Sequence, residues 1–140
     1  MALENKEAPS GLILSRQGVK DLPAASGDRA TEAKEATKGA YIVQNCEGDP
    51  DVILVANGSE VATLIGGAAK LSEEHGLKIR VVSAPSEGMF RNQSAAYQQG
   101  ILPAAIPTFG MTAGLPVALR GLVGPKGKVW GLEQFGYSAP

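Results

Sequence analysis

Four places in this 140-residue chain carry side chains of a type that could take part in chemistry. They are Cys46, His75, Arg16 and the turn at residues 58–60. A catalytic centre needs a nucleophile, base or metal ligand whose neighbours adjust its reactivity. His75 precedes a glycine, where a positive side chain suits the end of a helix. Cys46 has no cationic neighbour in sequence that would favour a reactive thiolate. We therefore expect both residues to be structural.

The turn Gly58-Ser59-Glu60 follows an apolar run and precedes a segment with helical spacing. Backbone N–H groups at such a helix start are a common binding place for anions. However, no further glycines stand at the spacing of a dinucleotide site, and no P-loop lysine follows. Glu60 would also repel a phosphate. A plain helix start, capped by the Ser59 hydroxyl, is the favoured interpretation.

Arg16 is the most suggestive charged residue. It stands between Ser15 and Gln17, directly after the apolar residues 12–14, which we expect to add an edge strand. A guanidinium group can hold a phosphate through two parallel hydrogen bonds. From residue type alone, a solvated surface arginine is the favoured interpretation of Arg16.

Composition excludes several classes of protein. The net charge is −1 with 19% charged residues and no basic stripe, which argues against a nucleic-acid-binding protein. Prolines and glycines interrupt the long uncharged stretches, such as residues 100–119, so no membrane span is expected. Residues 1–10 form a polar leader without the apolar core of a signal peptide. The single cysteine excludes an internal disulfide and a cysteine-built metal site, and it favours the cytoplasm or an organelle interior.

The elements that would position these residues follow from the hydrophobic pattern. Residues 51–56 are a continuous β-branched run, typical of a strand covered on both faces. A helix should follow, with five apolar residues at helical spacing facing the sheet: Val61, Leu64, Ile65, Ala68 and Leu71. Residues 77–83 form the next strand, which completes a parallel β-α-β unit. Gly66-Gly67 would weaken the helix, and we expect a close approach to a strand to compensate.

The rest of the chain supplies shorter elements. Residues 18–38 predict a surface linker with helical character at 30–36. The other expected elements are strands at 40–43, 106–113 and 128–132, a short helical stretch at 88–99, and a helical turn or two at 116–122. The fold class is therefore α/β, three-layered, with a mostly parallel sheet of about five strands.

Several segments, in this order, resemble the transketolase family. They are LILSRQ at 12–17, GAY at 39–41, DVILVANGSEV at 51–61, IRVVSAPS at 79–86, Met89-Phe90 before Tyr97, ILP at 101–103 and FGYSAP at 135–140. The resemblance implies three parts: the polar leader at 1–10, the end of the preceding pyrimidine-binding domain and a linker at 11–38, and the C-terminal domain at 39–140. That last domain stops before the final amphipathic helix of the family, which should leave an apolar face uncovered and favour self-association.

The resemblance also implies a function. Transketolases transfer a two-carbon ketol unit between sugar phosphates, with thiamine diphosphate and a divalent cation, magnesium or calcium, held between the first two domains of a homodimer. The third domain contributes little to this chemistry, so no catalytic, cofactor-binding or metal-binding residue is expected here. One role carries over: Arg16 matches the arginine that grips the substrate phosphate. The chain departs from the family at Thr112, where an acidic residue is usual, and in residues 115–124, which lack the expected tryptophan.

Three functions remain open at this point. The chain could be a structural, dimer-supporting transketolase domain that is inactive without its missing N-terminal thiamine-binding domains. It could be a free-standing ligand-binding or regulatory module that uses the crevice near Asn57, Gly58 and Ser83. It could also be one subunit of a split transketolase.

Overall fold

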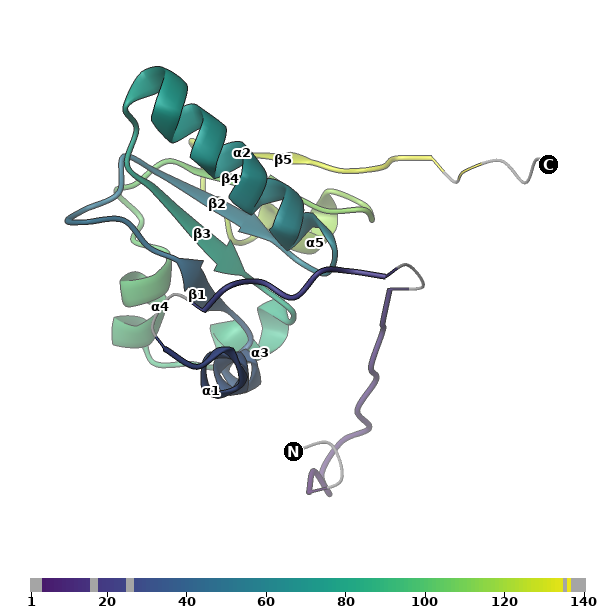
Figure 1. Cartoon of the computed structure of the whole chain (residues 1–140). Coiled ribbons are helices and arrows are strands. Elements are labelled where there is room, and N and C mark those ends of the chain that lie inside the picture. Colours follow the sequence, from purple (N-terminus) through teal and green to yellow (C-terminus); the bar gives the residue numbers. More distant parts are fainter. Residues whose placement is uncertain (1–3, 16–17, 25–26, 135, 137–140) are drawn as a thin grey trace.

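The computed structural model describes residues 4–15, 18–24, 27–134 and 136. Its sheet contains β1 (Tyr41–Gln44), β2 (Val52–Ala56), β3 (Ile79–Ser83), β4 (Thr108–Met111) and β5 (Lys128–Trp130), in the spatial order β1-β3-β2-β4-β5. Its helices are α1 (Arg29–Ala33), the 3₁₀-helix η1 (Lys34–Lys38), α2 (Glu60–His75), α3 (Glu87–Arg91), α4 (Ala95–Ile101) and α5 (Val117–Arg120). Figure 1 shows α2 lying across one face of the sheet.

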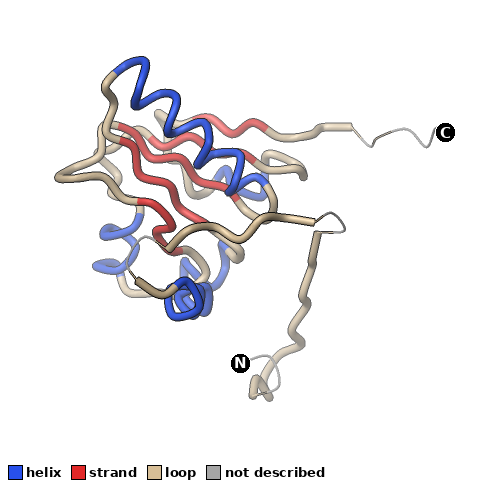
Figure 2. Tube along the Cα trace, viewed as in Figure 1, coloured by secondary structure: helices blue, strands red, loops and turns tan. Residues whose placement is uncertain are grey.

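The predicted β-α-β unit is confirmed. Val52 pairs with Ile79 and Ala56 with Ser83, and β2 and β3 run parallel. The pairs β2–β4 and β4–β5 are also parallel, whereas β1 pairs antiparallel with β3 at one edge. The strands and their separating helices can be followed in Figure 2. The α/β class with a mostly parallel, five-stranded sheet is therefore confirmed.

Two apolar cores make the three layers. On the α2 side, Val61, Leu64 and Ala68 of the helix pack against a core that includes Leu54 and Val81. The opposite face of the sheet packs against the shorter helices, through Phe90 of α3, Ile101 of α4 and Leu119 of α5. Ile53 and Val55, which point away from α2, are completely buried there. Burial on both faces explains why the β2 sequence is apolar throughout.

The ends of α2 agree only in part with expectation. Gly76 ends the helix in the left-handed conformation (φ 67°), with its N–H donating to Ser72, as predicted. The prediction that the Ser59 hydroxyl caps the helix is wrong. The backbone of Ser59 is already helical, and its hydroxyl donates to the Glu60 carboxylate at 2.9 Å. The compensation expected for Gly66 and Gly67 is wrong too, because a Cβ at either position would have no neighbouring atom within 4 Å.

Residues 88–99 do not form one helical stretch. The structure has α3 and α4 in its place, separated by residues 92–94. Each helix has its own serine cap: Ser86 accepts from the Met89 N–H at 3.4 Å, and Ser94 accepts from the Tyr97 N–H at 3.2 Å. The second cap restarts the chain in a new direction, which the apolar spacing alone could not reveal.

The edge strand expected at residues 12–14 is also wrong. These residues are extended but pair with no strand, and Leu12, Ile13 and Leu14 are 76%, 100% and 82% exposed. The two sheet edges in the described chain are β1 and β5, and residues 12–14 lie alongside neither. A strand needs a partner for its backbone groups, so apolar side chains alone do not create one.

The segment before β1 packs on the domain more closely than a linker would. Asp28 caps α1 by accepting from the N–H groups of Ala30 and Thr31, and its hydrogen bond from Thr31 lowers the pKa of this carboxyl. Gly39 then turns the chain with φ 87°, its Cα pressed against the backbone of residues 86–90. The Tyr97 hydroxyl donates to the Ala40 carbonyl at 2.9 Å. The helical character predicted at 30–36 is confirmed as α1 and η1.

Gly66→Ala and Gly67→Ala should each raise the free energy of unfolding by about 1 kcal/mol, because alanine removes the helix penalty of glycine and its methyl group meets no atom. Urea unfolding followed by circular dichroism measures the change. Gly39→Ala is the matched control and should destabilise the domain, since its φ is positive and its Cβ would overlap backbone. A loss of stability in both α2 variants would contradict the open space assigned to these positions.

Tyr97 should make stability fall in alkaline solution. Burial is the main cause that raises the pKa of its phenol above the ordinary value of 10.0. A raised pKa means that the folded state holds the proton more tightly, so stability is complete below pH 10 and declines as the pH rises past it. Thermal unfolding of the wild type and of Tyr97→Phe should show a steeper loss above pH 10 in the wild type. Parallel curves for the two proteins would count against this assignment.

Candidate functional site

The carboxyl ends of the parallel strands are where open α/β sheets usually bind ligands, at the point where the strand order reverses. In this sheet β2 continues to β3 on one side, and β4 continues to β5 on the other, so the reversal lies between β2 and β4. Asn57 and Thr112 follow these two strands. Thr112 donates its hydroxyl to the side-chain amide oxygen (Oδ1) of Asn57 at 2.9 Å and accepts from the Gly114 N–H at 3.1 Å. The polar groups at this position therefore bind one another.

The turn before α2 offers no better anion site. Gly58 adopts φ 59°, and its carbonyl accepts from the Val61 N–H at 3.4 Å. Ser59 directs its hydroxyl to the carboxylate of Glu60. That carboxylate lies at the helix start, where it would oppose a phosphate. The turn is therefore a helix start, as expected, although Ser59 does not cap it.

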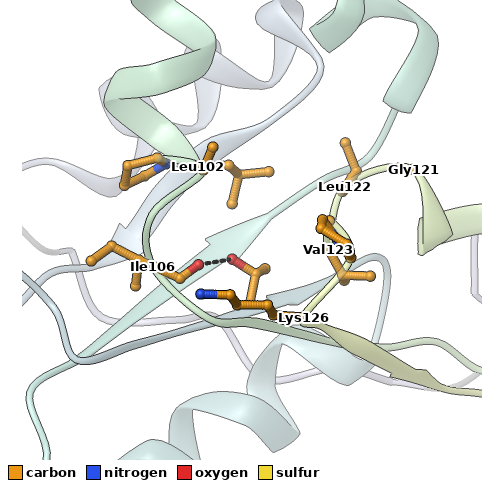
Figure 3. A pocket seen from close by; sticks show the side chains of 11 residues that line it. Leu102, Ile106, Gly121, Leu122, Val123 and Lys126 are labelled. Atoms are coloured by element: carbon orange, nitrogen blue, oxygen red, sulfur yellow. Dashed lines mark hydrogen bonds between the residues drawn. The ribbon is translucent and has the colours of Figure 1, made fainter.

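Figure 3 shows a recess of about 230 Å³ at the opposite end of the sheet, between the loops that lead into β4 and β5. Apolar side chains of Leu102, Ile106, Leu122 and Val123 form most of its wall. Thr108, its main polar lining group besides Lys126, donates its hydroxyl to the Ile106 carbonyl at 3.3 Å. The recess is thus a mostly apolar hollow whose polar side chains are those of Thr108 and Lys126.

A second concavity of about 390 Å³ lies between α1, η1, α4 and β1, and it collects charged and phenolic groups. Arg29 donates to Glu32 at 3.0 Å and to the Tyr41 hydroxyl at 2.9 Å. Lys38 donates to Glu35, a hydrogen bond that raises the pKa of the Lys38 ammonium, and it lies 4.9 Å from the centre of the Tyr97 ring. Because the charges are matched in pairs, this cluster attaches α1 and η1 to the domain and leaves no group prepared for catalysis.

The remaining candidates from the sequence stay apart. His75 is exposed at the end of α2, 3.9 Å from the Glu74 carboxylate. The Cys46 thiol approaches only the Gly48 carbonyl, at 3.8 Å. The two residues lie on separate segments, and their expected structural roles stay predictions. Arg16 lies outside the described residues, so its role as a phosphate ligand stays a prediction.

The described residues do not fit a bound divalent cation. Within them, no three or more histidine, cysteine, aspartate or glutamate side chains gather where they could hold a metal ion. Magnesium and calcium prefer several oxygen ligands around one point. We therefore assign no described residue to a metal ion or to a diphosphate. In the same residues, no helix is both long and apolar enough to cross a membrane.

One surface feature is an exposed apolar area on β4 and β5, whose residues the sequence did not predict. Met111 of β4 packs on the α2 side, so Phe109, two residues earlier, points to the same side. Trp130 of β5 pairs with Met111 and therefore shares this face. Phe109 is 39% and Trp130 59% exposed. We call Phe109 and Trp130, which are exposed on this face, the β4–β5 flank; Leu115, Val117 and Leu132 in the neighbouring segments are exposed as well.

The segments that follow β4 and β5 lie against one another. The Leu132 N–H donates to the Gly114 carbonyl at 2.9 Å, and Gly131 lies against Pro116. The sequence signal for the flank was weak, because an apolar residue at every second position fits a covered strand as well as an uncovered one.

Comparison with known proteins gives a consistent result along the chain. The family model described as "Transketolase-like TK C-terminal domain" matches residues 39–140. Transketolase 1 of Vibrio cholerae is 40% identical, and Transketolase 2 of Aliivibrio fischeri is 42% identical, each over all of this chain and 20% of the relative. The chain thus spans about a fifth of the length of these curated relatives.

Solved structures agree. The transketolase of Campylobacter jejuni superposes with a TM-score of 0.70 and 31% identity, covering 88% of this chain and 17% of that protein. The transketolase of Leishmania mexicana gives a TM-score of 0.66 and 34% identity, over 76% and 15%. The fold of the chain and its sequence matches therefore agree. The chain is a member of the transketolase-like C-terminal domain family.

Proposed function

We propose that this chain serves as the structural C-terminal domain of a thiamine-diphosphate-dependent transketolase, and that it is inactive alone. The observation that carries the proposal is the match of the whole chain to one fifth of enzymes named transketolase. The site geometry supports it, because the groups at the carboxyl ends of β2 and β4 are bonded to one another. In the complete enzyme, the reaction would be ketol transfer between sugar phosphates in a cytoplasmic homodimer.

The cofactor and its cation belong, in this proposal, to the thiamine-binding domains that this chain does not include. Their chemistry is the stabilisation of a carbanion during two-carbon transfer. The part of the chain that the structure describes offers no cluster of metal ligands to share in it. The domain contributes packing surface and holds the chain before it in position.

Arg16 is the one residue of this chain that we assign to the substrate. Its guanidinium would bind the phosphate of a sugar phosphate, a task that suits a planar, permanently charged group. The assignment rests on the resemblance of residues 12–17 to the corresponding transketolase segment. It requires the preceding domains, because a single arginine on an isolated domain has no second group to complete the site.

The two alternatives fare differently. A free-standing ligand-binding module would need an open crevice near Asn57, Gly58 and Ser83, and the Thr112–Asn57 hydrogen bond occupies the point where the strand order reverses. A split enzyme, in which this chain joins a separate thiamine-binding subunit, has the same domain role as the main proposal. Co-purification with such a subunit would support the split form.

Calorimetric titration of the isolated 140-residue chain with thiamine diphosphate and magnesium should show no saturable heat. The physical reason is that the described residues supply neither a metal cluster nor a free anion-binding turn. A complete transketolase titrated under the same conditions is the positive control. Tight binding by the isolated chain would overturn the proposal that it is structural.

A chimaera tests Arg16 in context. This chain replaces the matching C-terminal fifth of the Vibrio cholerae Transketolase 1, with which it is 40% identical. Arg16→Ala in the chimaera should raise KM for phosphorylated substrates on the order of tenfold or more, the cost of a lost charge-assisted hydrogen bond. KM for an unphosphorylated ketol donor should stay unchanged. An equal effect on both donors would show that Arg16 does not bind the phosphate.

A further inference from the structure

The junction between β2 and α2 contains a dipeptide that can react with itself. Asn57 follows the last residue of β2, and Gly58 follows Asn57, which makes the one Asn-Gly pair of the sequence. Asn5, Asn45 and Asn92 precede lysine, cysteine and glutamine. The backbone nitrogen after an asparagine can attack the side-chain amide carbon within the same chain. A glycine at that position has no side chain to obstruct the approach.

The backbone of this pair is not held by regular structure. Neither residue belongs to a helix or a strand, and Gly58 adopts φ 59°, a region that glycine enters without strain. The Gly58 carbonyl accepts from the Val61 N–H at 3.4 Å, but the Gly58 N–H donates to no group of the described residues. The nitrogen that would attack Asn57 is therefore not committed to another contact within the described chain.

Thr112 polarises the carbonyl that would be attacked. Its side chain belongs to a residue only 2% exposed, and its hydroxyl donates to Asn57 Oδ1 at 2.9 Å. This oxygen gains negative charge when a nitrogen adds to the neighbouring carbon, and a fixed donor stabilises such a developing oxyanion. The Thr112 oxygen also accepts from the Gly114 N–H at 3.1 Å, which holds the hydroxyl in place. Sequence supplies the nucleophile and tertiary structure supplies the donor.

We propose that Asn57 is a site of spontaneous deamidation, with Thr112 as the group that stabilises the oxyanion. The Gly58 nitrogen bonds to Cγ of Asn57, and the side-chain amide nitrogen leaves with the displaced proton as ammonia. The product of this step is a cyclic imide. Water then adds to either carbonyl of the imide and opens the ring to aspartate or isoaspartate. Water is the only co-reactant, and no atom is oxidised or reduced. The inference does not depend on the proposed function.

Asn45 provides a comparison within the same chain. Its Oδ1 accepts from the Arg80 Nε–H at 3.0 Å, so its side-chain carbonyl is polarised as well. The residue after it is Cys46, whose side chain obstructs the approach of its own backbone nitrogen. Both asparagines thus have a donor on Oδ1, but only Asn57 is followed by glycine. A difference in rate between them reports the contribution of Gly58.

The reaction would alter the connection between two elements of the central β-α-β unit. Ala56, directly before the site, pairs with Ser83 of β3, and α2 begins at Glu60. Isoaspartate routes the main chain through the side-chain carbon and so lengthens the link between β2 and α2. Aspartate keeps the normal main chain but adds a negative charge near the Glu60 carboxylate, where like charges repel. We expect the isoaspartate form to be the less stable of the two.

The first test is incubation of the full 140-residue chain in mildly alkaline water enriched in heavy oxygen, followed by peptide mass spectrometry. Asn57 should take up the label on the order of tenfold or more faster than Asn45 and Asn92, because an unobstructed attack has a lower barrier. Fragmentation should identify isoaspartate at position 57. Uptake at Asn57 that is no faster than at the other two residues would overturn the proposal.

Substitution then tests the hydroxyl. Thr112→Val keeps the shape of the side chain but removes the donor, and it should slow the reaction at Asn57 roughly tenfold, a modest loss for an oxyanion donor. Thr112→Ser keeps the donor and should react like the wild type. The rate at Asn45 should be the same in all three proteins, and circular dichroism checks that each is folded. An unchanged or faster rate at Asn57 in Thr112→Val would contradict the role of Thr112.

A synthetic peptide of residues 51–61 gives the rate without Thr112 even if Thr112→Val does not fold. It contains the same Asn-Gly pair, so it should react more slowly than the folded chain. A peptide that reacts faster would show that the fold protects Asn57, and the proposal would fail. Thermal unfolding of the converted chain, with Asn57→Asp as the matched control of equal charge, should show the lower unfolding temperature in the isoaspartate form.

Discussion

The burial of β2 on both faces is the constraint on which the rest of the structure depends. Its residues alternate between a core closed by α2 and a core closed by α3, α4 and α5. A strand in this position cannot tolerate a polar residue on either side, and it fixes where β3 and β4 pair. Every helix of the domain takes its position from one of these two faces. The apolar run at residues 52–56 is therefore both the strongest sequence signal and the strand that contributes to both cores.

The same arrangement decides what the domain can do. A parallel sheet brings loop residues together at its carboxyl edge, and in many folds of this kind that edge binds a ligand. Here Thr112, buried at 2% exposure, donates to Asn57 across the point where the strand order reverses. A hydroxyl satisfied by a neighbouring amide strengthens the junction of two strands and leaves no group free for a substrate. Proteins that share this architecture therefore need not share a binding site at this position.

The segment before β1 has a different relation to the domain. Leu22 packs on the α2-side core, Arg29 binds Tyr41, and Lys38 lies over Tyr97. These contacts fix residues 28–38 to the domain and give the chain that precedes them a defined direction. In the role proposed for this chain, a connection fixed in this way would transmit position between domains. The exposed residues 12–14 lie beyond that attachment.

The sequence by itself determined the central β-α-β unit and the α/β class, because strand 52–56, helix 60–75 and strand 79–83 have strong periodic signals. Tertiary structure alone decided the rest. Whether Ser59 caps a helix depends on its backbone angles, and whether residues 12–14 form a strand depends on a neighbour far along the chain. The break between α3 and α4 and the exposure of Trp130 likewise depend on what packs beside them. Local pattern reports which face is apolar, but only the assembled layers determine whether anything covers it.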